Sequence, residues 1–291
     1  MKFKRLKSLI LCAAVAVGAL FTGCSDNGKE SSSSITESSL PGAEQVLSGG
    51  NIDEVSVNSG DLVAVIEIEN FGTIKAKLFP EAAPVGVENF QKLAESGFYQ
   101  GKNIHRVMQE FMFQGGSLNG NGTGGDAMVN GGSFGVEKAD NMRHFYGALC
   151  YANYQGSNST QFYIVTNKEQ GVFDSDYQYF KSQVEKCNEL IKKAKEAGAS
   201  DYVSYYTSVK NSLKETIEKY EKTPGNVKEL YNKIGGTPQL DGDYTVFGQV
   251  YEGFDVIDAV AAVEVSDNGA GELSKPNEEI IIKNITVSTV E

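Results

Sequence analysis

Few residues of this 291-residue chain could do chemistry, and the most distinctive of them is an arginine set among apolar side chains. Arg106 lies two residues before Met108 and five before Phe111. The chain holds only two histidines and four cysteines, and no spacing among them matches a metal site, which argues against a zinc centre or a haem. We expect His105 to be a buried, hydrogen-bonded structural imidazole and His144 to be a loop residue. What remains is a fixed positive charge beside apolar residues, with no metal and no cofactor.

The net charge of the chain argues against one class of binding partner. The net charge of −12 at pH 7 points away from nucleic acid, because a phosphate backbone needs a basic surface. Residues 1–23 hold four bases and no acid, so the chain without them carries −16. Hydrophobic residues make up 40% of the sequence, which is enough for a core, and the 32 glycines suit a turn-rich β architecture.

The elements that must position Arg106 can be predicted from periodicity. Alternating apolar and polar residues predict strands at 62–68 and 72–79, and Pro84 then begins a helix that Gly97 ends. Further short strands are predicted at 103–109, 111–114, 146–151, 161–166, 245–250 and 279–287, with a second helix at 254–263. Many short antiparallel strands with two helices indicate a mainly β barrel of about eight strands, capped at its ends.

Residues 168–238 interrupt this pattern. Apolar residues recur there three and four positions apart in three stretches, which Gly198 and Pro224-Gly225 separate. The spacing predicts two amphipathic helices of ordinary length and a shorter third, an antiparallel hairpin packed against the barrel. We therefore interpret residues 60–291 as one domain with a helical insertion at 168–238.

Several blocks of residues occur in an order that points to one family. They are Ile104-His105-Arg106-Val107-Met108, FMFQGG at 111–116, NGTGG at 121–125, GALCYAN at 147–153, QFYI at 161–164 and LDGDYTVFG at 240–248. Together they resemble the cyclophilin-type peptidyl-prolyl cis-trans isomerases, over about residues 60–167 and 239–291. The resemblance implies a cyclophilin-like antiparallel β-barrel, here with an inserted helical hairpin.

The same resemblance implies catalysis of rotation about X–Pro bonds. Rotation must break amide resonance, a barrier of ~18–20 kcal/mol, and needs no acid, nucleophile, metal or cofactor. The proline nitrogen regains a lone pair in the twisted state, so a fixed cationic donor aimed at it stabilises the transition state more than the ground state. By its match to the family's catalytic arginine, Arg106 takes this role, for which a planar and permanently charged side chain is suited.

The remaining site residues follow from the same match. Gln114 joins Arg106 as a catalytic residue. The proline socket is expected to be lined by Phe111, Met112, Tyr163 and Leu240. Gln114, Ala152, Asn153 and Gln161 are expected to position the substrate backbone, the last two through hydrogen bonds. The full substrate-binding set is Phe111, Met112, Ala152, Asn153, Gln161, Tyr163, Leu240 and Tyr244.

The sequence departs from the family pattern at the rim of this site. Gln239 stands where the family often has tryptophan, Tyr244 replaces a histidine, and Tyr163 replaces a phenylalanine. The stretch 153–161 is about one residue shorter than the common form, and the predicted insertion ends directly before Leu240. These changes predict an altered groove around an intact arginine and a largely intact socket.

The first 23 residues are typical of a secretory signal peptide, with a basic start and an apolar run too short to span a bilayer. The run ends Leu20-Phe21-Thr22-Gly23-Cys24, which resembles a bacterial lipobox and implies a lipid on Cys24. Residues 24–59 are rich in Ser and Gly, so we expect a flexible tether. This places the protein outside the cytoplasm, anchored to the bacterial cell membrane. The alternative is an ordinary secreted protein in which Cys24 is incidental.

Two interpretations of function remain after these observations. In the first, the protein is a monomeric, lipid-anchored isomerase that acts on proline-containing exported polypeptides and assists their folding. In the second, the barrel is a binding module or chaperone that captures a protein partner through its groove and its insertion, with little isomerase activity. The intact arginine favours the interpretation as an enzyme, whereas the altered rim of the site and the large insertion are compatible with a binding module. A third class, a structural surface protein, has only the anchor in its favour.

Overall fold

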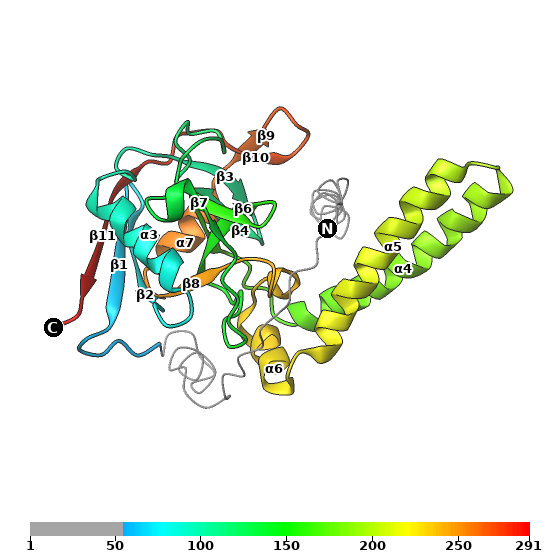
Figure 1. Cartoon of the computed structure of the whole chain (residues 1–291), viewed down its shortest axis with the longest axis horizontal. Coiled ribbons are helices and arrows are strands. Elements are labelled where there is room, and N and C mark those ends of the chain that lie inside the picture. Colours follow the sequence, from blue (N-terminus) through cyan, green and yellow to red (C-terminus); the bar gives the residue numbers. More distant parts are fainter. Residues whose placement is uncertain (1–54) are drawn as a thin grey trace. The chain divides into compact units, whose positions relative to one another are not determined.

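A computed structural model describes residues 55–291 (Figure 1). The predicted signal peptide, the predicted lipidation site at Cys24 and the tether up to residue 54 lie outside the described residues. Contacts divide the described chain into two compact units, a smaller one of residues 174–223 and a larger one of residues 55–173 and 224–291.

A curled antiparallel sheet makes up most of the larger unit. Its main path runs in the order β11-β1-β2-β8-β6-β7-β4-β3, with the short β5 beside β7, while β9 and β10 form a separate ladder. The strands are β1 (Leu62–Ile68), β2 (Gly72–Leu78), β3 (Ile104–Met108), β4 (Met112–Gly115), β5 (Phe134–Gly135), β6 (Ala148–Tyr154), β7 (Ser157–Val165), β8 (Val246–Glu252), β9 (Val265–Asp267), β10 (Leu273–Pro276) and β11 (Ile282–Thr289). The prediction of a mainly β fold with about eight antiparallel strands is confirmed.

The two edges of this sheet approach each other at one end. The amide of Ile104, where β3 begins, donates to the carbonyl oxygen of Ile280 at 2.8 Å, and the amide of Ile282 donates to Lys102 at 2.8 Å. β1 pairs with β11 along its whole length, from Leu62 opposite Thr289 to Ile68 opposite Ile282. The sheet therefore curls back on itself, and β1 forms its edge-side hydrogen bonds with β11.

Two helices cover the apolar interior, as the sequence predicts. α3 (Pro84–Glu95) places the wholly buried Phe90 against the rings of Tyr99, Phe162 and Phe247, with centroids 5.1–5.7 Å apart. α7 (Phe254–Ala261) buries Val256, Ile257 and Val260 and packs on β2, β3 and β4. Aromatic residues are favourable here because each ring removes a large apolar area from water.

Three further helices occupy the segment in which the spacing predicts them. α4 (Val172–Glu196) and α5 (Ser200–Lys222) form an antiparallel hairpin, in which the buried Tyr220 packs on Phe180 and donates a hydrogen bond to Asp176. α6 (Gly225–Ile234) belongs to the larger unit instead, because its wholly buried Tyr231 packs on Phe145 with centroids 4.5 Å apart. The smaller compact unit, 174–223, is thus narrower than the 168–238 insertion predicted from sequence, whose status as an insertion stays a prediction.

After these helices, the chain returns at Gly236 to the neighbourhood of Asn167. The Asn167 amide donates to the carbonyl of Gly236 at 2.9 Å, and Gly235 and Gly236 both have positive φ. A Cβ atom at Gly235 would lie 2.5 Å from the Asn167 carbonyl oxygen, and one at Gly236 would lie 2.4 Å from that of His144. Only glycine fits this close crossing of two backbone segments.

Among residues 55–291, none of the helices combines the length and the apolar character needed to cross a membrane.

Candidate active site

One face of neighbouring strands carries most of the predicted site residues. Side chains alternate between the two faces of a sheet, so Met112 and Gln114 share one face of β4 while the wholly buried Phe113 points to the other. Gln114 lies opposite Arg106 of β3 and opposite Tyr163 of β7. The strand register therefore sets the charge, the amide and the aromatic ring in one row.

An apolar cluster, which we call the socket cluster, forms beside this row. Its buried members are Phe79, Met108, Met112, Met142, Ala148, Cys150, Tyr163, Val165 and Val246. Partly buried residues pack against it, among them Phe111, Ala152, Leu240 and Tyr244. The six apolar or aromatic residues expected to bind substrate are therefore brought together by β4, β6, β7 and the loop that precedes β8.

Arg106 lies at the edge of the socket cluster and is partly exposed. Its Nη2 group contacts the sulfur of Met108 at 3.1 Å, and its Nη1 group donates to Gln114 Oε1 at 3.4 Å. The Gln114 amide donates in turn to Gln161 Oε1 at 2.9 Å, and Gln161 donates to the carbonyl of Gly122 at 3.0 Å. Three of the four predicted polar residues, Arg106, Gln114 and Gln161, thus form one hydrogen-bonded row.

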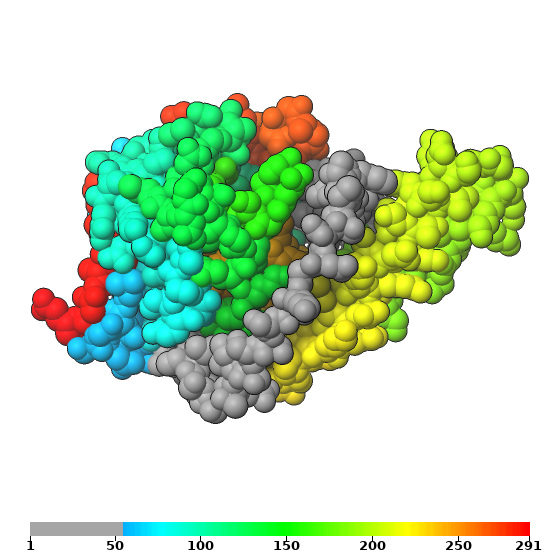
Figure 2. Space-filling model, in the orientation of Figure 1, coloured from blue at the N-terminus to red at the C-terminus, as the bar shows by residue number. Residues whose placement is uncertain are grey.

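The strongest partner of Arg106 was not predicted from the sequence. Glu272 lies between β9 and β10 and accepts two hydrogen bonds, from Arg106 Nε at 2.7 Å and from Nη2 at 2.8 Å. Burial, the largest single influence, acts to raise the pKa of Glu272, but the hydrogen bonds of Arg106, the nearby Ser274 and the charge of Arg106 together hold this pKa below its ordinary value of 4.5. Figure 2 shows the β9–β10 hairpin, in orange, at the surface of the larger unit.

The chain matches the sequence model of a known protein family. The sequence model of the family described as cyclophilin type peptidyl-prolyl cis-trans isomerase/CLD matches residues 63–222 and 226–287. This chain belongs to the cyclophilin-type peptidyl-prolyl cis-trans isomerase family. The sequence prediction of the family, and of an isomerase, is confirmed at this level.

Relatives agree with the family assignment, and solved structures agree with the fold. A protein of Staphylococcus aureus USA300 named as a peptidyl-prolyl cis-trans isomerase is 31% identical over 232 residues, covering 79% of this chain and 94% of the relative. A protein of Streptococcus pyogenes named as a bifunctional phosphatase/peptidyl-prolyl cis-trans isomerase is 34% identical over 221 residues, and the match spans 75% of this chain and 37% of that protein. A crystal structure of a Cryptosporidium parvum cyclophilin-type isomerase covers 79% of this chain and 99% of its own, with a TM-score of 0.52 at 21% identity. A second, in the presence of the dipeptide Ala-Pro, gives 0.51 at 21% identity, covering 78% and 99%.

A buried polar network holds one side of the socket cluster of this cyclophilin. His144 is a loop residue, as predicted, but it is wholly buried, with Nδ1 2.9 Å from Asp241 and Nε2 3.0 Å from the hydroxyl of Tyr163. The Tyr231 hydroxyl of α6 donates to the same Asp241 at 2.9 Å. Burial raises the pKa of Tyr163 well above its ordinary value, so this hydroxyl stays neutral. Sequence reasoning missed this network, although a tyrosine in place of a phenylalanine signals a buried hydroxyl that needs a partner.

Asn153 and His105 have surroundings that the sequence did not predict, and the substrate-binding role of Asn153 stays a prediction. The side chain of Asn153 donates to the carbonyl of Asp243 at 3.0 Å and accepts from Gly156, so it binds the chain's own loops. His105 was expected to be buried and hydrogen-bonded, but it is partly buried and its Nδ1 lies buried without a partner. Burial, followed by the charge of Arg106, lowers the pKa of His105 to about 4.

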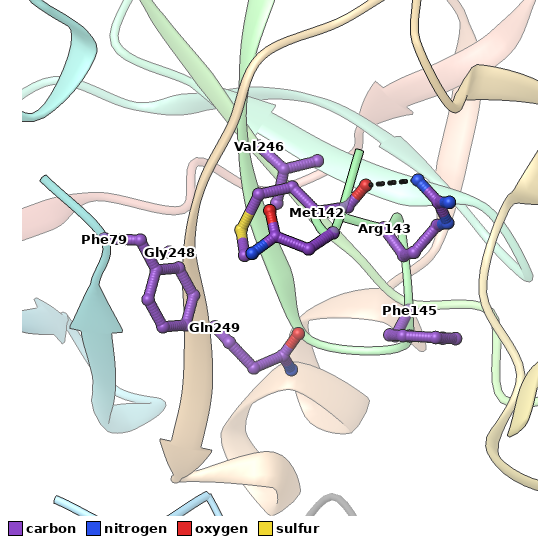
Figure 3. A pocket seen from close by; sticks show the side chains of 8 residues that line it. Phe79, Met142, Arg143, Phe145, Val246, Gly248 and Gln249 are labelled. Atoms are coloured by element: carbon purple, nitrogen blue, oxygen red, sulfur yellow. Dashed lines mark hydrogen bonds between the residues drawn. The ribbon is translucent and has the colours of Figure 1, made fainter. Parts of the chain in front are cut away.

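A small pocket lies elsewhere against the socket cluster. It is lined by Phe79, Asn141, Met142, Arg143, Phe145, Val246, Gly248 and Gln249 (Figure 3). Arg143 closes part of it by donating to the carbonyl of Met142 at 3.1 Å. Its volume of about 10 Å³ holds at most a water molecule, so it does not serve as a proline socket. The described residues hold no group of His, Cys, Asp and Glu side chains suited to a metal ion.

Proposed function

We propose that this cyclophilin catalyses rotation about X–Pro bonds of exported polypeptides, with Arg106 as its catalytic residue. The observation that carries the proposal is the position of Arg106, at the edge of an apolar cluster that contains the predicted socket residues. An apolar ring held against Phe111 and Met112 would leave its nitrogen at this edge, where the charge of Arg106 is available.

The proposed catalysis is electrostatic. The proline nitrogen gains a lone pair as the amide twists, and the Arg106 guanidinium stabilises this developing acceptor more strongly than it stabilises the planar amide. Gln114 accepts from Nη1 and limits the rotation of the guanidinium plane. Burial of the ring in the socket cluster supplies affinity without favouring either isomer, and no group needs to be protonated or deprotonated.

Substrate backbone positioning is assigned to the row beside the arginine. Gln161 already shares a hydrogen bond with Gln114, so it can exchange the Gly122 carbonyl for a carbonyl of the peptide. Asn153 acts indirectly in this proposal, because its bond to Asp243 fixes the loop that carries Leu240 and Tyr244.

The location of the reaction is also a proposal. The basic, then apolar first 23 residues and the small residues before Cys24 support export and lipid attachment. A tethered enzyme outside the membrane would meet polypeptides as they emerge unfolded, when their X–Pro bonds have not yet reached the isomers of the folded state.

An isomerisation assay on a proline peptide tests the proposal, using residues 25–291. We expect catalysis by the natural sequence and a loss on the order of 10²-fold in kcat/KM for Arg106→Ala, since one electrostatic contact at the transition state is worth this much. Arg106→Lys should recover only part, because an ammonium lacks the planar fork. Lys75→Ala, which removes a surface ion pair with Glu252, is the control. Full activity in folded Arg106→Ala would reject the role of Arg106.

One observation favours the binding module as a second candidate. Tyr202 and Tyr205 are 61% and 53% exposed near the start of α5, and both rings contact Tyr206. Exposed aromatic side chains are common anchors in protein interfaces. A folded natural protein that binds unfolded polypeptide but does not accelerate isomerisation would favour this candidate.

A further inference from the structure

We propose that Glu272 is a positioning residue for the isomerase reaction, which orients Arg106 through a two-point hydrogen bond. The inference rests on the proposed function, since it concerns the residue to which that function assigns the chemistry. Glu272 itself need not touch the substrate. Its effect on the reaction is exerted through the plane of the guanidinium.

The geometry of the pair fixes which edge of the guanidinium the carboxylate occupies. The Oε1 atom of Glu272 accepts a hydrogen bond from Nε of Arg106, and Oε2 accepts one from Nη2. The carboxylate therefore lies along the Nε–Nη2 edge of the guanidinium. A fork of this kind fixes the plane as well as the position of the group, which a single contact cannot do. The Nη1 group is directed towards Gln114, in the row that faces the socket cluster. The carboxylate on the opposite edge therefore sets the direction in which Nη1 points.

The loop between β9 and β10 is built to hold Glu272 in place. Asp267 accepts hydrogen bonds from the amides of Gly269 and Gly271, at 2.7 and 3.1 Å, and the amide of Asn268 donates to the carbonyl of Glu272 at 2.9 Å. β10 packs against β3, the strand that carries Arg106. The β9–β10 hairpin is outside the main sheet. Near Arg106 it supplies the Glu272 side chain and a contact with β3.

Burial distinguishes this pair from ordinary surface ion pairs. The side chain of Glu272 is only 10% exposed and that of Arg106 is 28% exposed, whereas Lys75 and Glu252 are 36% and 58% exposed at a similar distance of 2.9 Å. A carboxylate with so little access to water keeps its charge only with a partner, so each member of the pair constrains the other. An exposed pair is weak because both side chains remain free to rotate.

The first test compares Glu272→Gln, Glu272→Asp and the control Glu252→Gln in the isomerisation assay. Glu272→Gln keeps the shape but offers one acceptor and no charge, so we expect kcat to fall by about tenfold with KM changed by less than about twofold, as a misplaced catalytic group predicts. Glu272→Asp keeps both acceptors on a shorter stem and should recover part of the rate. Glu252→Gln should leave the rate unchanged. A folded Glu272→Gln protein with the natural kcat would overturn the proposal.

The second test asks whether Glu272 acts through Arg106. In the Arg106→Ala background, Glu272→Gln should alter the residual rate by less than about twofold, because a positioning residue has nothing left to position. An equal loss in both backgrounds would show that Glu272 acts elsewhere. The two proposals fail separately: full activity in Arg106→Ala rejects the catalytic role, whereas loss in Arg106→Ala with full activity in Glu272→Gln rejects only the positioning role.

The protein itself supplies an observable that does not depend on the rate. The Nε–Hε signal of Arg106 in a nitrogen-15 spectrum should show slow exchange with solvent in the natural protein and in Glu272→Asp. Glu272→Gln should bring faster exchange and a shifted signal. Identical signals in all three proteins would contradict a fixed guanidinium plane. Fast exchange in the natural protein would contradict it too, and that measurement needs no variant to fold.

Discussion

Arg106 has acceptors of three kinds around one guanidinium: a carboxylate, an amide oxygen and a thioether sulfur. Its removal has a consequence for stability as well as for rate, because the buried Glu272 would lose its charged partner. A partly exposed arginine ordinarily contributes little to the fold, but the pair with Glu272 gives Arg106 a structural role as well. Variants of Arg106 should be checked for their free energy of unfolding before their rates are compared.

Phe111 and Phe113 differ in what their removal should cost. Phe113 is wholly buried behind β4, so Phe113→Ala should lower the free energy of unfolding by about 3–5 kcal/mol. Phe111 is only partly buried against the socket cluster, so Phe111→Ala should cost clearly less stability but raise KM and lower kcat for a proline peptide. Urea denaturation and the isomerisation assay on both variants measure this. If Phe111→Ala leaves both kinetic constants unchanged, Phe111 is not a socket wall.

His105 should make the stability of the protein depend on pH. Its pKa is lowered from 6.5 to about 4, so between these values the unfolded chain binds a proton that the folded chain does not. The free energy of unfolding should therefore fall as the pH drops through this window, by up to about 3 kcal/mol. The carboxylates of Glu272 and Asp61, whose pKa values are also lowered, lose their contributions only at lower pH.

Urea midpoints at pH 7 and pH 4.5 for the natural protein and His105→Gln test this. The variant should lose less stability on acidification than the natural protein, because it has no imidazole to protonate. Equal losses in the two proteins would assign the pH dependence to other groups.

The elements of the barrel could be predicted from sequence because their residues follow strict periods. β1 matches the predicted 62–68 residue for residue, and α3 begins at Pro84 as expected. The β9–β10 ladder could not be found in the same way, since its short strands carry mostly exposed residues around the turn Asp267-Asn268-Gly269. An Asn-Gly pair is a hairpin signal, but it does not show which strand the hairpin packs against. Glu272 was missed for this reason, while Arg106 and the apolar site residues were found through the family's blocks.

The helical hairpin permits a prediction at the same scale. Replacing residues 174–223 by a short glycine-containing link should leave a folded barrel, because Phe173 already packs against Tyr231 and lies within 5.7 Å of Lys228 on α6. Circular dichroism melting should show one cooperative transition, and the isomerase activity should remain.

A second variant, in which the wider range 168–238 is deleted, should be compared with the 174–223 deletion. It removes Tyr231, which bonds Asp241, and the glycines at which the chain crosses Asn167. We expect this variant to be much less stable than the narrower one. If the narrow deletion also loses its cooperative melt, residues 174–223 are part of the folding unit of the barrel.

At the scale of the whole molecule, the proposed anchor is the feature that decides where the enzyme works. Cys24→Ser should move the protein from the membrane fraction to a soluble or unprocessed form, because the proposal makes this thiol the attachment point of the lipid. Fractionation of cells followed by detection of the protein in each fraction measures this. Membrane association that is unchanged by the substitution would reject the lipoprotein proposal. The barrel variants above should not alter the distribution.

The pairing of β1 with β11 sets the order in which a growing chain can finish folding. Synthesis delivers residue 62 long before residue 289, yet these two residues face each other in the sheet. Until the last strand is available, β1 offers a bare row of backbone donors and acceptors that another chain could occupy. Contacts between such distant residues also form slowly, because a long loop must close first. A copy of this isomerase whose synthesis stalls before β11 is therefore itself aggregation-prone, and becomes a substrate for the kind of folding catalyst to which it belongs.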